Sequence, residues 1–359
     1  MNFSKIIQKK SKILLPLSWL YRLGVTCHSF LYNSGIKKSV SFDMPVICVG
    51  NLSVGGTGKT PMVEYLLKLL SKKYRVAVIS RGYKRKTRGF LIAGEHTKAD
   101  DIGDEPMQFY KKFSDAKIAV GENRVQAINE LIKNAPQIDA IVLDDAFQHR
   151  AVQAGFNLLL TEYDNLFVND FYLPAGQLRD LKSNYKRADI IIITKSPANL
   201  SSENKNKIID QVKPFSHQIV LFTSFKYEEP YNIFTKSIFS LELFNEILLV
   251  TGIANPSPLI QYLDQKVKRI HLQKYSDHHH FSKEEINLIK EKYFTINNDK
   301  KTIITTEKDA MRLFEFEKDL LDVPVLAIPV AHHFLFEGET IFEKHIIQYI
   351  ENKYNGKKK

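Results

Sequence analysis

The sequence predicts an α/β fold with a mostly parallel sheet, a second, smaller α/β domain and an N-terminal helix. Two observations lead to this prediction. Short apolar runs rich in β-branched residues alternate with segments whose apolar residues recur at helical spacing, which is typical of parallel strands with helices on both faces. The length of 359 residues is also more than one ordinary domain needs. We expect an N-terminal segment at 1–42, a first domain at 43–225 and a smaller domain at 226–359, whose last helix can pack back on the first.

The composition is that of a folded protein, with 44% hydrophobic and 25% charged residues. Two cysteines are too few for a disulfide scaffold or a four-cysteine zinc site, and they fit a reducing compartment. The net charge of +11 comes from the two ends, because residues 1–42 hold seven basic residues and no acidic one, and residues 353–359 hold four lysines. The rest of the chain is balanced. We therefore predict that the ends meet an anionic surface, and we predict no nucleic-acid partner.

The segment 13–32 is apolar and aromatic, but Pro16 and Arg22 are among the residues that interrupt it. A membrane-spanning helix needs about 20 mostly apolar residues without such breaks. We predict an amphipathic helix that lies in a membrane interface, with Trp19 and Tyr21 among the acyl chains and lysines toward the head groups. The alternative is a terminal helix that packs on the protein body.

The remaining elements follow in order along the chain. The first domain is predicted to contain six short apolar strands, at 45–50, 75–80, 117–120, 139–143, 157–161 and 189–194, with helices at 61–73 and 122–133. The later strands are predicted at 219–225, 247–252, 267–272, 302–306 and 323–330, with helices at 256–263 and 282–293. Ser282 is a natural N-cap for the last of these helices. The polar stretch at 227–236 is a candidate hinge.

A glycine-rich loop joins the first predicted strand to the first predicted helix. Its sequence is Ser53-Val54-Gly55-Gly56-Thr57-Gly58-Lys59-Thr60. The glycines let backbone N–H groups approach phosphate oxygens, and the start of the helix adds partial positive charge. Lys59 can reach the β- and γ-phosphates, and Thr60 can offer a hydroxyl to Mg²⁺. The strict pattern has glycine in place of Ser53, so this is a variant P-loop; an ordinary glycine-rich turn is the alternative.

A pair of carboxylates, Asp144 and Asp145, follows the strand at 139–143. A carboxylate at the end of a neighbouring strand is the second metal-holding element of a P-loop enzyme, although a strand ending in aspartate is by itself commonly a turn. The next polar residues, Gln148 and His149, either orient groups in the site or begin a helix, and the sequence leaves both interpretations open.

Further charged residues lie where they can take part in chemistry. Arg81 follows the second strand, at the sheet edge where α/β proteins bind ligands, and could hold phosphates; a solvated basic loop is the alternative. The run 103–106 introduces a predicted helix with Glu105 as N-cap and Pro106 at the first position. Asp104 is then either part of the helix start or a base that accepts the proton of a substrate hydroxyl.

Three adjacent histidines, 278–280, follow Asp277. Neighbours in a loop rarely bind one metal ion together, so a zinc site is not favoured. A single histidine, oriented by Asp277 or acting with a carboxylate across a cleft, fits the pattern better.

Together these motifs resemble the tetraacyldisaccharide 4′-kinases, the lipid A kinases of Gram-negative bacteria. The motifs occur in the expected order over nearly the whole chain, at 49–51, 55–61, 80–83, 103–106, 144–150, 173–176, 179–180, 277–278 and 306–309. The resemblance implies that ATP, with Mg²⁺, phosphorylates the 4′-hydroxyl of tetraacyldisaccharide 1-phosphate to give lipid IV-A. It also implies a cleft that closes on substrate, a peripheral location on the cytoplasmic face of the inner membrane, and no obligate protein partner.

The resemblance also assigns roles to individual residues. Asp104 and His278 match the two residues that act together as the base in the family, with His278 tuning the basicity of Asp104. Lys59 and Arg81 are expected to stabilise the developing charge on the phosphate. Thr60, with Asp144 or Asp145, is expected to hold the metal ion. Asp180 stands where the family commonly has glutamate.

Two functions of other classes stay open. The first is a membrane-associated P-loop NTPase that acts as a switch or metallochaperone and phosphorylates no lipid. It would share the loop and the aspartate pair but would need no acceptor base. The second is a membrane-tethered binding protein, which predicts no nucleotide turnover.

Overall fold

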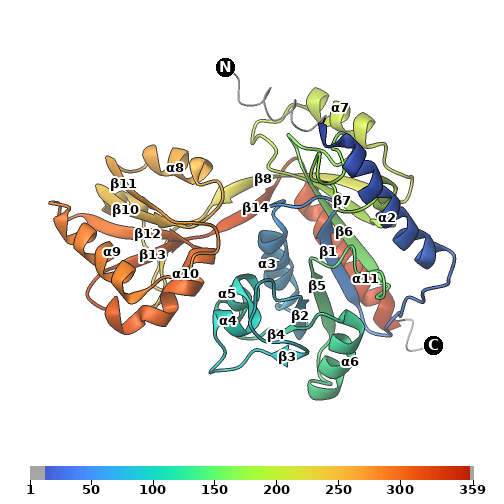
Figure 1. The fold of residues 1–359 in the computed structure, drawn as a ribbon, viewed down its shortest axis with the longest axis horizontal. Coiled ribbons are helices and arrows are strands. Elements are labelled where there is room, and N and C mark those ends of the chain that lie inside the picture. The colour runs from blue at the N-terminus through green and yellow to red at the C-terminus, as the bar shows by residue number, and fades with distance from the viewer. Residues whose placement is uncertain (1–12, 356–359) are drawn as a thin grey trace.

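The computed structural model describes residues 13–355, and two separate sheets organise them (Figure 1). The larger sheet has nine strands in the order β14-β8-β7-β6-β1-β5-β2-β4-β3. The central strands pair in parallel, whereas β3 and β14 are antiparallel to their neighbours. The bounds are β1 Val46–Asn51, β2 Val76–Ser80, β3 Leu91–Ile92, β4 Lys117–Val120, β5 Ala140–Asp144, β6 Phe156–Glu162, β7 Ile190–Thr194, β8 Ile219–Tyr227 and β14 Val330–Phe334.

Helices cover both faces of this sheet, because its central strands are apolar on both sides. One face carries α3 (Lys59–Leu70), α5 (Asp104–Lys112) and α11 (Gly338–Asn355), whose buried residues share a core. The other face carries α6 (Arg124–Asn134) and α7 (Ser202–Val212). The short helix α4 (Ala99–Ile102) leads directly into α5. This double cover is the layered arrangement that the strand–helix alternation predicts, and it confirms the expected fold class.

The smaller sheet has five strands in the order β11-β10-β12-β13-β9, and only β9 is antiparallel. Its bounds are β9 Tyr231–Asn232, β10 Glu246–Thr251, β11 Arg269–Lys274, β12 Lys301–Thr306 and β13 Val325–Ile328. Its helices are α8 (Ser257–Asp264), α9 (Lys283–Thr295) and α10 (Glu307–Leu313). Ser282 caps α9 with a complete capping box, as its sequence predicts.

The chain crosses between the sheets twice, through β8 and β14, which pair with each other (Figure 1). The apolar run predicted as one strand at 323–330 is split between β13 in the small sheet and β14 in the large one. Residues 330–355 therefore lie on the first sheet, and α11 packs back on it. The domain boundary at residue 225 itself stays a prediction.

The helix start predicted around Glu105 is wrong. Gly103 takes a positive φ of 94° and its N–H bonds to the Ala99 carbonyl, so α4 ends there and α5 begins at once with Asp104. Pro106 lies in the first turn of α5, where its missing N–H leaves no hydrogen bond unmade. A side chain on Gly103 would also press on the Tyr83 carbonyl oxygen, which a Cβ would meet at 3.0 Å. This glycine therefore places Asp104 at the start of α5.

The N-terminal helix α2 (Leu15–Asn33) lies against the larger unit (Figure 1). Ser18 and Ser29 are its buried residues, and Tyr21 donates to the Arg179 carbonyl oxygen. Its large apolar side chains point the other way, with Trp19 69% and Leu23 60% exposed. Within 13–355, no helix combines the length and hydropathy needed to cross a bilayer. The lysines predicted to face head groups before Leu15 lie outside the described residues.

Candidate active site

The glycine-rich loop follows β1 and runs into α3, as its motif requires. Gly58 has a φ of 88° and precedes the first residue of the helix. A Cβ at this position would meet the Phe225 ring at 2.8 Å, so glycine is required both by its backbone angle and by space. Asn51 donates to the Thr57 hydroxyl at 3.0 Å, and the N–H of Val54 donates to the Gln177 carbonyl oxygen at 2.8 Å. The loop is thus held from both sides in a shape that can cradle phosphates.

Asp144 ends β5 beside this loop and is buried. Ser80 donates to its carboxylate at 3.1 Å from the end of β2. Burial, with the neighbouring charge of Asp145, raises the pKa of Asp144 to about 7.

Asp145 is the next residue and has different surroundings. It adopts a left-handed backbone with φ of 47° and lies 3.7 Å from the Lys59 ammonium. Arg179 pairs with both of its oxygens and also donates to Asn51 at 2.6 Å. Burial alone would raise the pKa of Asp145, but Lys59 and Arg179 outweigh it and hold that pKa below its usual value. Asp145 therefore already has two cationic partners, Lys59 and Arg179, whereas Asp144 has none within residues 13–355.

The donor set at this edge fits Mg²⁺. Carboxylate and hydroxyl oxygens are the ligands this ion prefers, and Asp144 is a buried carboxylate without an ion pair of its own among the described residues. Thr60, directly after Lys59 in the first turn of α3, has a hydroxyl that can serve as a further oxygen ligand. Burial and the neighbouring charge of Asp145 raise the pKa of Asp144, and the charge of a bound cation would offset both effects.

The basic residues at the same edge divide into exposed and buried ones. Arg81 is exposed at the end of β2, directly after Ser80. Arg124, at the start of α6, is buried and donates to the Asp144 carbonyl oxygen at 3.4 Å. Its N–H also donates to His149 at 3.3 Å, and burial lowers the pKa of His149 to about 4. Gln148 donates to the Asn51 carbonyl oxygen, so this pair of residues supports the loop and does not begin a helix.

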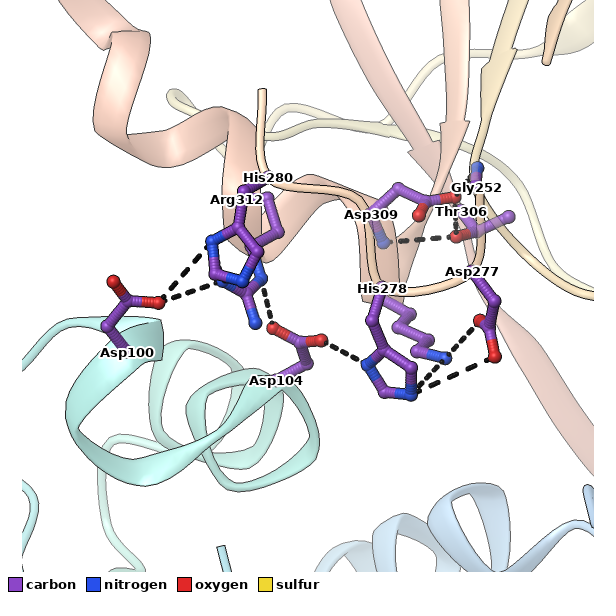
Figure 2. A network of polar contacts seen from close by, with 10 residues as sticks. Asp100, Asp104, Gly252, Asp277, His278, His280, Thr306, Asp309 and Arg312 are labelled. Atoms are coloured by element: carbon purple, nitrogen blue, oxygen red, sulfur yellow. Dashed lines mark hydrogen bonds and ion pairs between the residues drawn. The ribbon is translucent and has the colours of Figure 1, made fainter. Parts of the chain in front are cut away.

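Asp104, at the start of α5, and His278, in the loop between β11 and α9, come together from the two parts of the molecule (Figure 2). Oδ2 of Asp104 lies 2.8 Å from Nδ1 of His278, and the aspartate is only 2% exposed. The Lys308 ammonium lies 3.1 Å from Nε2 of the same ring and can only donate. This contact fixes Nε2 as an acceptor and Nδ1–H as the donor to Asp104. His278 has a φ of 60°, a strained value of the kind that occurs at functional sites.

The three adjacent histidines contact three different partners. His278 contacts Asp104, His279 lies 2.9 Å from the Glu285 carboxylate, and His280 contacts Arg312. His279 thus joins the cap of α9, since Glu285 is also the capping-box residue. Asp277 pairs with Lys308 at 2.9 Å, so it orients His278 through that lysine.

The nucleotide-loop residues and the Asp104–His278 pair are neighbours at one edge. Tyr83, two residues after Arg81, has its ring centroid 5.5 Å from that of His278. Glu105, beside Asp104, contributes to the raised pKa of Asp144. Sequence reasoning gave no role to Arg312, whose guanidinium touches Asp104. One signal could have found it: it lies one helical turn after Lys308 in the motif at 306–309.

This arrangement defines a class of protein. A phosphate-binding loop and paired carboxylates at the carboxyl edge of a parallel sheet, with a carboxylate–histidine pair facing them, are the parts of a P-loop phosphotransferase. The chain matches the family described as tetraacyldisaccharide-1-P 4′-kinase over residues 10–351. It belongs to that family, so its enzyme class is that of a kinase, and the resemblance drawn from the motifs is confirmed.

Individual relatives cover almost the whole chain. It is 45% identical to the tetraacyldisaccharide 4′-kinase of Flavobacterium johnsoniae over 341 residues, which are 95% of this chain and 97% of the relative. It is 42% identical to the protein of the same name from Bacteroides fragilis, covering 97% and 96%. A crystal structure of LpxK from Aquifex aeolicus in complex with ATP superimposes with a TM-score of 0.74 at 26% identity, covering 95% of this chain and 99% of that one.

Proposed function

We propose that this chain transfers the γ-phosphate of ATP to the 4′-hydroxyl of tetraacyldisaccharide 1-phosphate, which yields lipid IV-A. Family membership supports the reaction. The observation that carries the residue assignment is the buried Asp104–His278 contact at 2.8 Å, beside the phosphate loop. A nucleotide switch would need no such acceptor base, so this contact favours the kinase over the switch or metallochaperone.

The loop residues bind and orient the nucleotide in this proposal. Backbone N–H groups of residues 55–60 donate hydrogen bonds to the phosphates, and the Lys59 ammonium stabilises the negative charge on the γ-phosphate. Thr60 and Asp144 would hold Mg²⁺, with Asp145 fixed beside them by Lys59 and Arg179. Bound there, Mg²⁺ supplies charge neutralisation of the phosphate oxygens. Arg81 is exposed at the same edge and can turn toward the transferring group.

Asp104 and His278 carry out the proton transfer in this proposal. Asp104 accepts it from the 4′-hydroxyl as that oxygen attacks the γ-phosphorus and the bond to ADP breaks. His278 holds Asp104 in position and lowers its pKa through their hydrogen bond. Lys308 keeps the ring in the tautomer that donates to Asp104. The proton then rests on the carboxyl group until it is released to solvent.

The acceptor lipid would enter between α2 and the larger unit. A cavity of about 330 Å³ lies there, with mostly apolar α2 residues on one side and the polar side chains of Gln148, Arg150, Arg179 and Asp180 on the other. Arg179 joins this cavity to Asp145 of the nucleotide edge. A mixed apolar and basic lining suits a molecule that carries both acyl chains and a phosphate. The exposed apolar face of α2 supports peripheral contact with the cytoplasmic leaflet of the inner membrane.

The first test is transfer of labelled phosphate from ATP and Mg²⁺ to detergent-dispersed tetraacyldisaccharide 1-phosphate. We expect Lys59→Ala and Asp104→Asn each to lower kcat roughly a hundredfold or more, because one loses charge stabilisation and the other the base. Lys68→Ala, on the exposed side of α3, and Asp139→Asn, in a surface ion pair with Arg75, are the matched controls.

The outcomes separate the candidate functions. Labelled lipid from the wild type and both controls, with loss in both site variants, supports the kinase and its base. Hydrolysis of ATP with no labelled lipid contradicts the proposal and favours the nucleotide switch. Full activity in Asp104→Asn contradicts the base assignment alone.

A further inference from the structure

Arg312 is a buried arginine at the end of α10 that faces the helices of the other sheet (Figure 2). Its Nε lies 2.6 Å from Oδ1 of Asp104, the oxygen that His278 does not contact. Its Nη1 lies 2.9 Å from Oδ1 of Asp100 in α4. One guanidinium therefore pairs with two carboxylates from the α4–α5 corner while its own backbone belongs to the smaller sheet.

The surroundings of Arg312 hold it in this position. His280 lies on Nη1, with its Nε2 2.8 Å away, and its Nδ1 is 3.5 Å from Asp100. Lys86 also pairs with Asp100 from the loop after β2. Because Arg312 is 5% exposed, water competes little for these contacts. This accounts for His280, to which neither the motif pattern nor the proposed mechanism gave a role.

We propose that Arg312 is a positioning residue for the acceptor base: it holds the carboxylate of Asp104 against His278 and keeps it ionised. The inference rests on the proposed kinase function and extends it to a residue that touches neither nucleotide nor lipid in that proposal. A planar, two-pronged guanidinium can bridge Asp100 and Asp104, whereas an ammonium is a single point of charge. The contact also joins α5 to α10. Asp104 is therefore held in position only when the helices of the two sheets are packed together.

The charges that face Asp104 set the direction of the effect. His278 faces it from the loop before α9 and Arg312 from α10, while Asp277 and Lys308 face the far side of the His278 ring. Burial by itself raises the pKa of Asp104, but the contacts with His278 and Arg312 outweigh it and leave that pKa below its usual value. Without Arg312 the pKa must rise, because a buried carboxylate loses an adjacent positive charge.

The test compares Arg312→Gln and Arg312→Lys with wild type in the lipid-phosphorylation assay, with kcat measured from pH 4 to pH 9. For Arg312→Gln we expect the acid limb of the profile to move up by roughly one unit or more, as loss of an adjacent opposite charge implies. Because the wild-type pKa of Asp104 lies below its usual value, the loss of kcat is expected to be greatest at the acid end of the range and to shrink toward pH 9. Arg312→Lys keeps the charge and is expected to restore the acid limb most of the way.

The control is Arg75→Gln, which breaks an arginine–aspartate pair with Asp139 on the surface, far from the site, and should leave the profile unchanged. A merely structural role of Arg312 would lower kcat equally at every pH and equally in both variants, and that result would overturn the inference. So would unchanged profiles. Thermal unfolding of each variant shows whether the protein is folded, and Arg312→Lys keeps the test decisive if Arg312→Gln is not. A wild type that labels no lipid would overturn the kinase proposal as well, and so stands apart from failure of this inference alone.

Discussion

Asp144 differs from its neighbour Asp145 in the direction of its pKa shift, because it is buried beside a second aspartate and has no ion pair of its own in the part of the chain that the structure describes. Its pKa of about 7 lies above that of an aspartate in an unfolded chain. The unfolded state thus loses its proton first, and stability is lost as the pH rises from the unfolded pKa toward 7, and stays lost above it. The carboxylate that we propose as a ligand of Mg²⁺ is thus one whose ionisation destabilises the fold.

We therefore expect Asp144→Asn to raise the melting temperature at pH 8 in a chelating buffer, by about 2 °C or more, while it abolishes kinase activity. The gain should fade toward pH 4, where the wild-type carboxyl is also neutral, and added Mg²⁺ should stabilise the wild type more than the variant. Thermal unfolding across pH measures this. Asp139→Asn is the control of opposite sign, because Arg75 holds the pKa of Asp139 below its usual value. A variant no more stable than wild type at pH 8 would contradict the prediction.

Single residues could be predicted from the sequence wherever a short motif carries the chemistry. The loop 53–60, Asp144 and Asp145 occur next to their strand, so local spacing was enough to find them. Asp104 and His278 were paired only through the family resemblance, since 174 positions separate them. Arg312 was missed for the same physical reason: its partners Asp100 and Asp104 belong to the other sheet, and no local pattern encodes a contact that only the assembled fold creates.

At the scale of elements, three helices meet on a buried charge cluster formed by Glu64 of α3, Lys112 of α5 and Glu307 of α10. The Lys112 ammonium lies 2.6 Å from each carboxylate. Gln108 donates to Glu64 at 2.8 Å, and burial with the neighbouring Glu307 raises the pKa of Glu64 to about 7. The cluster joins the helix of the phosphate loop to the helix that begins with Asp104.

We expect Lys112→Met to destabilise the protein by about 3–5 kcal/mol, because it leaves two buried carboxylates without their cation. Glu64→Gln should cost much less, since a carboxyl with a pKa of about 7 is already protonated about half of the time at pH 7, and an amide can keep the contact with Gln108. Urea denaturation at pH 7 compares the two. Equal losses in both variants would contradict the view that Lys112 neutralises the cluster.

Elements themselves were predicted best where one pattern dominates. Buried strands such as β7 are continuous apolar runs, and Ser282 marks α9 through its cap. The patterns at 202–212 and 338–355 are more mixed. Helix α7 was not predicted, and the last helix, α11, was expected only without bounds. The split of 323–330 into two strands depends on which sheet each half joins, which is a tertiary choice that an apolar run does not express.

At the scale of the whole molecule, the exposed apolar residues of α2 and the basic chain ends are both features that suit contact with an anionic membrane surface. Along α2 the two buried residues are serines, whereas large apolar side chains such as Trp19 and Leu23 are exposed, which is unusual for a packed helix. The sequence offered a membrane helix and a packed helix as alternatives. In the structure α2 packs on the body and leaves apolar side chains exposed, and its contact with a membrane stays a prediction. The basic excess lies at the chain ends rather than on the body, and anionic head groups would attract it.

We expect the double variant Trp19→Ser, Leu23→Ser to bind anionic phospholipid vesicles at least about tenfold more weakly than wild type, because each buried apolar side chain contributes about 1.5–3 kcal/mol. Neither residue lines the cavity beside α2, so activity on detergent-dispersed lipid should persist. Phe294→Ser is the matched control, since Phe294 is 56% exposed on α9 of the smaller sheet. Co-sedimentation measures binding, and wild-type binding should also weaken with salt, since the basic ends contribute through a screened attraction. Equal loss in the control would mean that any exposed aromatic residue suffices, and undiminished binding of the double variant would show that α2 is not the contact with the membrane.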